Sequence, residues 1–337
     1  MVNSTAIKSA AACLRCSWFA LPAVISAAVA LAFPTVASAE PVPAVIAAVP
    51  VGVAPLGVAL SPCADSAYVA NAGDNTVSVI SERSNKVTAT IPVGVAPHDV
   101  ATDPATGVAY VTDAGGNTVS VIDERTNKVT ATIPVGTGPV GVAADAMTDT
   151  VYVADNTDNT LSVISGRTDK VIATIPLGDG PSGVAIDENT DTVYVTDATG
   201  NTVNAINGRT DKVTATVPVG TSPFELTVNT ATDTVYASNY ADNTVSVISG
   251  RTDKVTGTIP VGTQPFQVGV DPETRTVYVA DSGDNAVSVI SGRTDKVTGT
   301  ISAGTQPFGV SVDTGTGHVY VSNPGDNTVD VIAGFRP

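Results

Sequence analysis

Short runs of apolar and β-branched residues, separated by turn-forming residues, follow one another from about residue 44 to the end of the chain. In the segment that begins at Ile259, the runs are PFQVGVD, TVYVAD, AVSVIS and KVTGTI. Runs of this length and composition are typical of β-strands, and the Asp, Asn, Gly, Thr and Pro residues between them favour tight turns. Helical periodicity does not interrupt the pattern, which predicts four strands in each segment of this kind.

The four-strand unit recurs with a constant spacing of 42 residues. Its seven copies begin at Val49, Ile91, Ile133, Ile175, Val217, Ile259 and Ile301. Because the spacing never changes, the copies must occupy equivalent places in one repetitive structure. Two all-β architectures stack such units, a closed β-propeller and an open solenoid with capped ends.

The two ends of the repeat region favour the closed ring. The seventh copy stops after its third strand, 328–332, whereas residues 44–50 align with the fourth strand of the first full unit, 86–92. An N-terminal strand that completes the last blade removes the exposed sheet edges of an open array. The sequence therefore predicts an all-β fold over 44–337, a seven-bladed β-propeller of four-stranded antiparallel blades, closed by three C-terminal strands and one N-terminal strand.

The repeat also has a recognisable sequence signature. The second strand reads YVAN at 68–71, YVTD at 110–113, YVAD at 278–281 and YVSN at 320–323, and DNTVSVI follows at 74–80. From about residue 44 to 334 the chain resembles the YVTN family of β-propeller repeat proteins. The resemblance implies a propeller fold. Similar proteins include archaeal surface-layer components and bacterial periplasmic propellers, one of them credited with binding DNA, and the repeat itself carries no catalytic residue.

Residues 1–39 have the pattern of a secretory signal peptide. Lys8 and Arg15 precede a mostly apolar stretch, and the small residues Ala37, Ser38 and Ala39 follow it. This order is typical of a cleaved signal. We expect a mature chain that begins at Glu40, with 40–43 as a short linker, no membrane span after cleavage, and a secreted, periplasmic or cell-envelope location.

The net charge argues against nucleic acid as a partner. The full chain has 16 basic and 32 acidic residues; Lys8 and Arg15 leave with the signal and no acid does, so the mature chain has 14 and 32, a net charge of −18. Such a charge repels phosphate backbones, and the basic residues are spread evenly over the repeats instead of forming a patch. Nucleic-acid binding is therefore the third of the functions considered.

The sequence offers little metal, haem or nucleophile chemistry. Cys63 remains alone after signal cleavage and is expected to be an unreactive loop thiol. His98 and His318, the two histidines, occupy different places in the repeat and are expected on opposite faces, each as a surface residue. They cannot share a metal ion across a strand. We expect no cofactor and no bound metal.

Recurrent acidic turns are the remaining metal candidates. Asp155, Asp158 and Asn159 recur as Asp281, Asp284 and Asn285, and with Asn in the first place in blades one and seven. Calcium loops alternate their ligands at every second residue, whereas here the spacing is three and then one. Turns stabilised by side-chain bonds to the backbone explain the same residues. We therefore predict structural turns and no calcium site.

One position breaks the uniformity of the repeats. Directly after the proline that opens each inner strand, the copies carry Leu56, His98, Val140, Ser182, Phe224, Phe266 and Phe308. Three phenylalanines thus fall on blades five, six and seven, on one face and in one sector. The neighbouring candidates are Gln264, Gln306, Glu225, Gln267 and Tyr240, the only tyrosine outside the periodic set.

Two interpretations of the phenylalanines stay open. The rings either fill space between blades, or they form a shallow amphipathic patch suited to a peptide, a glycan or a partner surface. The sequence favours a monomeric, non-catalytic scaffold that binds an unidentified protein or envelope ligand. A lyase or hydrolase that uses acids near the mouth of the propeller is the alternative, and it is disfavoured because a catalytic site needs several unlike residues.

Overall fold

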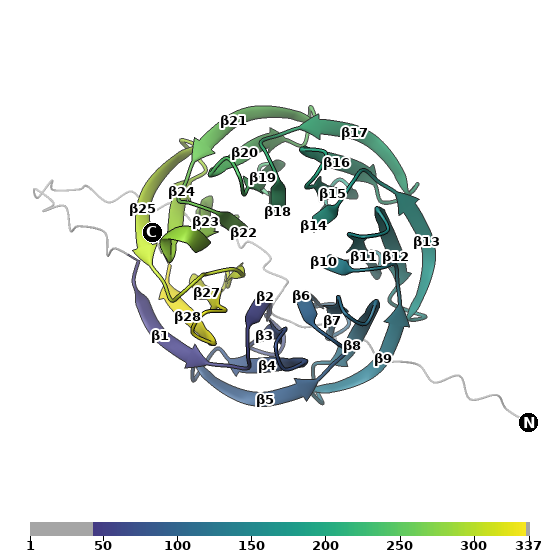
Figure 1. Ribbon diagram of the computed structural model, residues 1–337, viewed down its shortest axis with the longest axis vertical. Coiled ribbons are helices and arrows are strands. Elements are labelled where there is room, and N and C mark those ends of the chain that lie inside the picture. Colours follow the sequence, from purple (N-terminus) through teal and green to yellow (C-terminus); the bar gives the residue numbers. More distant parts are fainter. Residues whose placement is uncertain (1–42, 335–337) are drawn as a thin grey trace, which may run out of the picture.

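The computed structural model describes residues 43–334, and the seven predicted blades form a closed ring (Figure 1). The innermost strands are β2 (Pro55–Ser61), β6 (Pro97–Asp103), β10 (Pro139–Asp145), β14 (Pro181–Asp187), β18 (Pro223–Asn229), β22 (Pro265–Asp271) and β26 (Val310–Val312). The second strands are β3 (Ser66–Asn71), β7 (Val108–Asp113), β11 (Thr150–Asp155), β15 (Thr192–Asp197), β19 (Thr234–Asn239), β23 (Thr276–Asp281) and β27 (His318–Asn323).

The outer half of each blade is equally regular. The third strands are β4 (Thr76–Ser81), β8 (Thr118–Asp123), β12 (Thr160–Ser165), β16 (Thr202–Asn207), β20 (Thr244–Ser249), β24 (Ala286–Ser291) and β28 (Thr328–Ala333). The outermost strands are β5 (Lys86–Pro92), β9 (Lys128–Pro134), β13 (Lys170–Pro176), β17 (Lys212–Pro218), β21 (Lys254–Pro260), β25 (Lys296–Ser302) and β1 (Val45–Pro50). A single 3-10 turn, η1 (Ser282–Asp284), interrupts the pattern. Within residues 43–334, no helix has the length and apolar character needed to cross a membrane.

The core lies between blades. Four or more residues of every second strand are fully buried, because this strand packs against a neighbouring blade on each of its two faces. One such cluster joins Tyr68 and Val79 of the first blade to Val100 and Ile122 of the second. The outermost strands alternate between exposed and half-buried residues instead. Burial on both faces explains why the second strands are apolar at successive positions.

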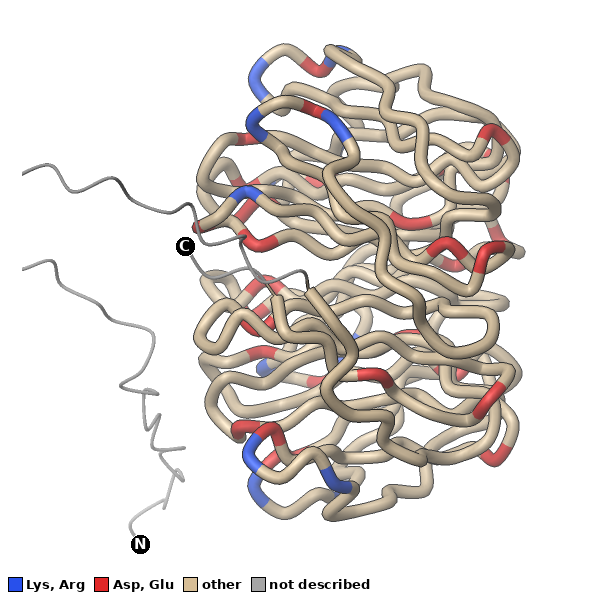
Figure 2. Tube along the Cα trace, turned by 90° about the vertical axis from the view of Figure 1, so that its left-hand side faces the viewer, with Lys and Arg blue, Asp and Glu red and all other residues tan. Residues whose placement is uncertain are grey.

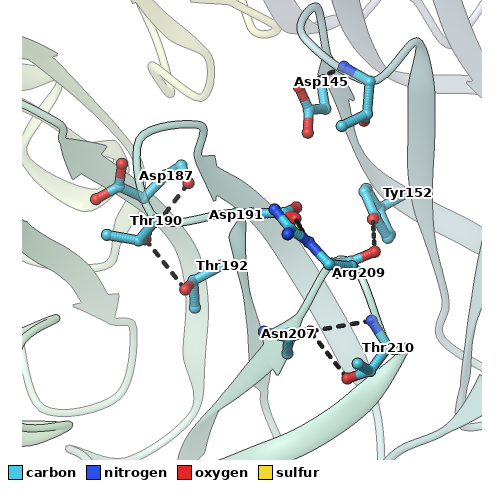
Figure 3. A network of polar contacts seen from close by, with 11 residues as sticks. Asp145, Tyr152, Asp187, Thr190, Asp191, Thr192, Asn207, Arg209 and Thr210 are labelled. Carbon is cyan, nitrogen blue, oxygen red and sulfur yellow. Dashed lines mark hydrogen bonds and ion pairs between the residues drawn. The ribbon is translucent and has the colours of Figure 1, made fainter.

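Periodic tyrosines such as Tyr68 and Tyr152 connect one blade to the next. Tyr152 of β11 donates its hydroxyl to the carbonyl of Gly208, 3.3 Å away in the following blade (Figure 3). Arg209 forms an ion pair with Asp191 beside it, at 3.5 Å. A Cβ atom at Gly208 would lie 2.3 Å from Asp191 Oδ1 and 3.1 Å from the Tyr152 hydroxyl, so glycine at this position leaves room for the Asp191 carboxylate. The tyrosines are thus part of the scaffold, as their periodicity predicts.

The recurrent Asp and Asn residues hold the turns together. In blade six, Asp281 accepts a hydrogen bond from the Ser288 hydroxyl at 2.6 Å, and Asp284 accepts one from the Thr263 N–H at 2.7 Å. Asn285, in the left-handed conformation with φ 53°, accepts an N–H from the turn that enters the next blade. The three side chains therefore point to three different partners. Among residues 43–334, no group of three or more His, Cys, Asp or Glu side chains is placed to hold a metal ion.

A β-bulge lies near the start of the innermost strands. Pro97 pairs with Asp113 and Val100 with Val111, so that residues 98–99 oppose a single residue of the second strand. The same register shift occurs in the first six blades. Such a bulge takes two residues out of the regular pairing and turns their side chains in a new direction. The position that varies among the repeats belongs to this bulge.

The ring closes as the sequence predicts. β1 pairs antiparallel with β28, from Val45 opposite Ile332 to Pro50 opposite Thr328, and completes the sheet of β26, β27 and β28 (Figure 1). Asn327 strengthens the junction, because its side-chain oxygen accepts the Ala54 N–H at 2.8 Å. Antiparallel hydrogen bonds therefore connect residues about 280 positions apart in the chain.

Deleting 44–49 from the mature chain should leave β28 as an open edge. We expect aggregation or loss of a single cooperative melting transition, measured by calorimetry and size-exclusion chromatography, because unpaired strand edges invite intermolecular pairing. Ile46→Thr is the control, since this side chain is 52% exposed and the substitution keeps the backbone pairing. Unchanged melting of the deletion variant would contradict the closure.

Calcium should not stabilise the fold. The Asp and Asn oxygens of the turns already accept backbone and hydroxyl hydrogen bonds, so the melting temperature should be the same in excess calcium and in excess chelator. A clear rise with calcium, measured by differential scanning fluorimetry, would show that these turns hold the ion.

Candidate functional site

The three phenylalanines meet at one end of the propeller axis. The ring centroids of Phe224 and Phe266 are 4.9 Å apart, those of Phe266 and Phe308 4.6 Å, and those of Phe224 and Phe308 5.7 Å. The His98 ring lies 5.6 Å from Phe308 and 6.4 Å from Phe224. His98 belongs to blade two and Phe224 to blade five, which are not neighbours, so the side chains reach toward one another across the axis.

Tyr240 extends this aromatic cluster outward. Its ring centroid is 5.1 Å from that of Phe266, and the residue lies in the turn between β19 and β20. All five rings, Phe224, Phe266, Phe308, His98 and Tyr240, are half-buried. The rings therefore pack on one another at the mouth and keep part of their surface open to solvent. This arrangement has features of both interpretations that the sequence left open.

His98 differs from the expected surface histidine. It is half-buried within the aromatic cluster, its Nδ1 atom is inaccessible, and that atom has no hydrogen-bond partner. Burial lowers the pKa of His98 to about 4, because the charged imidazolium is poorly solvated there. His98 is thus a neutral member of the cluster at neutral pH. His318 begins β27, at the opposite end of the strands, as predicted.

The next residue of each bulge forms a second layer, one step deeper along the axis. The seven positions of this layer, here called the neck, are Gly57, Asp99, Gly141, Gly183, Glu225, Gln267 and Gly309. Asp99 and Glu225 are 6% and 5% exposed. Asp99 Oδ2 accepts the Val142 N–H at 3.2 Å, and Gln267 Oε1 accepts the Val310 N–H at 2.7 Å. Polar side chains on three blades thus project into the neck.

Neighbouring glycines provide the room for these side chains. A Cβ atom at Gly57 would lie 2.3 Å from Asp99 Oδ1, and one at Gly183 would lie 2.5 Å from Glu225 Oε2. The Cα atoms of Asp99 and Glu225 would be only 2.6 and 2.8 Å away, so a larger residue at either glycine would also require the backbone of the next bulge to move. The small and large residues of the neck are therefore complementary.

Burial changes the acidity of both neck carboxyl groups. It raises the pKa of Asp99 to about 7. It raises the pKa of Glu225 well above its usual range, and the negative charge of Asp99 adds to this increase. Asp99 Oδ1 is buried without a hydrogen-bond partner. The two carboxyl groups thus retain proton affinity near neutral pH, which is the condition for acid–base work or for binding a cation.

Hydroxyl groups fix the bulges in place. Thr196 donates its hydroxyl to the Phe224 carbonyl at 2.7 Å, Ser238 donates to the Phe266 carbonyl at 2.5 Å, and Ser322 to the Leu56 carbonyl at 2.5 Å. In each case the donor lies in the preceding blade. The backbone that carries the aromatic rings is therefore held by the neighbouring sheet, and the rings sit on a rigid support.

The two faces of the disc carry different charges. The aromatic face consists of the turns 72–75 and 93–96 and their equivalents, which contain no Lys or Arg. Its exposed acids are Asp74, Asp158, Asp179, Asp242, Asp284 and Asp326. The opposite face, with turns 62–65 and 82–85 and their equivalents, carries the basic residues. Figure 2 shows Lys and Arg on one side of the disc and acids on both.

The predicted site residues fall into two groups. Phe224, Phe266, Phe308 and Tyr240 come together, and Gln264 and Gln306 are exposed in the turns before two of the rings. Glu225 and Gln267 instead point into the neck, below the patch with which the sequence grouped them. Sequence reasoning missed Asp99, although it stands at the same repeat position as Glu225 and Gln267, where four other copies carry glycine. The contrast between polar residues in three copies and glycine in the other four could have identified this position from the sequence.

Comparisons with known proteins support the fold. No protein-family model and no curated protein matches the chain. Among solved structures, it is similar to one described as Kuenenia stuttgartiensis hydrazine synthase. The TM-score is 0.75 at 20% sequence identity, over 83% of this chain and 95% of that one. A likeness at this identity is evidence for the seven-bladed propeller alone, and the resemblance to YVTN repeats rests on the repeat sequences themselves.

Proposed function

We propose that this protein is a secreted, non-catalytic scaffold whose aromatic face binds a cationic protein segment with an apolar tip. The proposal rests mainly on the aromatic cluster, which lies at the centre of a face whose turns carry six exposed acids and no Lys or Arg. Aromatic side chains that are half-buried and rigidly supported are typical anchors of binding surfaces. The secreted location follows from residues 1–39, which lie outside the described residues.

Charge complementarity specifies the partner. Lys or Arg side chains of a bound segment would face the acidic rim, where Asp242 and Asp284 lie in the turns of blades five and six. An apolar or cationic side chain would rest on the rings, which attract cations through their faces. Gln264 and Gln306, both exposed, supply hydrogen-bonding groups at the border. An acidic partner would be repelled from this face.

A second candidate function is catalysis, which the neck acids favour. Asp99 and Glu225 are two buried carboxyl groups whose raised pKa values suit general acid–base chemistry. A hydrolase or lyase of this kind would lose its activity in the isosteric variants Asp99→Asn and Glu225→Gln. The scaffold proposal takes precedence because the aromatic face offers a rigid binding surface, whereas within residues 43–334 no group of three or more His, Cys, Asp or Glu side chains is placed to hold a catalytic metal ion.

Substitutions of the rings should weaken binding of a cationic peptide. The probe is a fluorescein-labelled peptide of alternating Lys and Leu with one central Trp, and fluorescence anisotropy measures its binding. Phe224→Ala, Phe266→Ala and Phe308→Ala should each reduce binding by about 1 to 2 kcal/mol. Binding should also weaken with added salt, because exposed charges are screened.

Two controls use the same repeat position on blades one and three, which carry no phenylalanine there. Leu56→Ala and Val140→Ala should change binding less than the phenylalanine variants do, at equal melting temperature. A peptide with Glu in place of Lys should bind weakly or not at all. Equal losses in both sets of variants, or losses that follow the melting temperature alone, would refute the aromatic face as the binding site.

The exported protein should begin at Glu40. The small residues at 37–39 suit signal peptidase, so the intact mass of protein recovered from an exporting host should correspond to 40–337. Retention of residues 1–39 would contradict cleavage and would remove the support for a secreted location.

A further inference from the structure

The face opposite the aromatic cluster, here called the basic face, presents exposed cations at regular intervals. In each of the first six blades, the turn before the outermost strand contains an exposed arginine, and an exposed lysine begins that strand. The arginines are Arg83, Arg125, Arg167, Arg209, Arg251 and Arg293. Figure 2 shows the Lys and Arg residues gathered on one side of the disc. Among the described acids of this face, only Glu273 and Asp295 are exposed, and the others are half-buried or buried.

The arginines remain open to solvent although acids lie beside them. Arg167 Nε lies 3.6 Å from Asp149, and the arginine side chain is 80% exposed. Arg209 Nε lies 3.5 Å from Asp191 (Figure 3), and its side chain is 83% exposed. Exposed ion pairs of this kind contribute little to stability. The guanidinium groups are therefore available for contacts with acids of another molecule.

The basic face also carries one exposed apolar side chain close to the axis. Met147, in the turn between β10 and β11, is 73% exposed, more than any other large hydrophobic residue within 43–334. The Asp145 carboxylate accepts the Met147 N–H at 2.8 Å and holds the turn in place. No other copy of the repeat has a large apolar residue at this position. Methionine packs favourably against aromatic rings, so Met147 suits the kind of surface that the opposite face offers.

The two faces repeat their charges with the same angular spacing, because both follow the constant 42-residue repeat. Five of the six exposed aspartates of the aromatic face lie in turns between second and third strands, and the arginines lie between third and fourth strands. The two rings of charge therefore differ in radius by about one strand spacing, about 5 Å, which an arginine side chain spans. When two discs share an axis, rotation by whole blades keeps this match and can bring Met147 over the aromatic rings.

We propose that the cationic partner of the aromatic face is the basic face of a second copy of this chain, so that the discs stack head to tail. This inference rests on the proposed function, because it uses the same rings and the same acidic rim. Two aromatic faces, or two basic faces, would repel each other. In a head-to-tail contact each copy keeps one free face of each pair, so the stack grows beyond a dimer.

The net charge of the chain is compatible with such a contact. At an ionic strength of about 0.15 M, exposed charges are screened beyond about 8 Å. Each disc is thicker than this distance, since strands of six or seven residues span about 20 Å. The net charge of −18 of the mature chain therefore acts weakly from one disc to the next, whereas the facing Asp and Arg side chains are in contact.

Sedimentation velocity of the mature chain tests the stacking. At about 0.15 M potassium chloride the average mass should rise with protein concentration beyond that of a dimer, and about 1 M salt should return the chain to a monomer. Met147→Ala should weaken the association about fivefold, because it removes the contact with the rings. This variant is expected to fold, since Ala105 and Ala231 occupy the same turn position in two other blades.

Two variants blocked on opposite faces distinguish head-to-tail stacking from any other association. The first combines Asp242→Lys with Asp284→Lys on the aromatic face, and the second combines Arg167→Glu with Arg209→Glu on the basic face. Each variant alone should be a monomer. An equimolar mixture should form a dimer and nothing larger, because it contains one intact face of each kind.

The matched control is Ile172→Thr. Ile172 is 61% exposed on the outermost strand β13, and Thr88 and Thr130 occupy its position in blades one and two. It lies on the rim of the disc and on neither face, so this variant should associate as the unmodified chain does. Melting curves confirm that every variant is folded. The aspartate variants should pass this test, since Gly116 and Gly200 stand at the same position in two blades.

Several results would overturn the stacking. A chain that is monomeric at every concentration, as the sequence alone favours, would do so, and so would a mixture of the blocked variants without a dimer. Loss of association in Ile172→Thr would assign the contact to the rim. If the cationic peptide binds a chain that never associates, the proposed function stands with a different partner. If the chain stacks but does not bind the peptide, the aromatic face recognises the assembled basic face and not an isolated segment.

Discussion

Packing between blades is the interaction on which the rest of this molecule depends. Every second strand is covered on both faces, so its side chains must fit two neighbours at once. The hydroxyls of Tyr68 and Tyr152 add a directional contact from one blade to a turn carbonyl of the next, from Glu124 in one case and Gly208 in the other. In a closed ring every blade has two neighbours and must fit both of them. The seventh blade meets this condition because β1 pairs with β28 and completes its sheet. The constant repeat length follows from this demand.

The same constraint determines where the sequence is free to vary. A residue between blades has to match two surfaces, whereas the bulge residues near the axis contact chiefly other bulge residues and the strand starts beside them. The bulge at the start of the innermost strands turns two such residues inward, and the hydroxyls of Thr196, Ser238 and Ser322 hold the carbonyl groups of neighbouring bulges. Different residues at these positions alter the axis without disturbing the blades. Chemistry at the axis is therefore compatible with nearly identical repeats.

The sequence was sufficient for the fold because the fold is periodic. Four strands, their turns and the closing strand all follow from a pattern that recurs seven times, and the structure confirms each of them. The grouping of Phe224, Phe266 and Phe308 in one sector follows from the same alignment. The position of a residue in the repeat does not, however, tell how deeply its side chain is buried along the propeller axis. Adjacent residues on a regular strand point to opposite sides, but the bulge lets both Phe224 and Glu225 approach the axis.

The sequence also could not predict how deeply the side chains of His98 and Asp99 are buried near the axis. A histidine after a proline near a strand end suggests a solvated turn, and its burial depends on rings that arrive from blades five and seven. In the sequence, residue type alone does not distinguish Asp99 from the other acids among the 32 of the chain. Only the structure places its carboxylate against Gly57 of the neighbouring blade. Contacts of this kind join residues that are close only because the ring is closed, so no local pattern contains them.

The aromatic and neck layers depend on each other electrostatically. The rings cover the axis on one side of Asp99 and Glu225, and both side chains are buried, with 6% and 5% of their surface exposed. This shielding is the main cause of their raised pKa values. A protonated carboxyl group is neutral, so its burial costs less free energy than the burial of a carboxylate. The aromatic cluster on one face thus also contributes to the raised pKa values of the two acids below it.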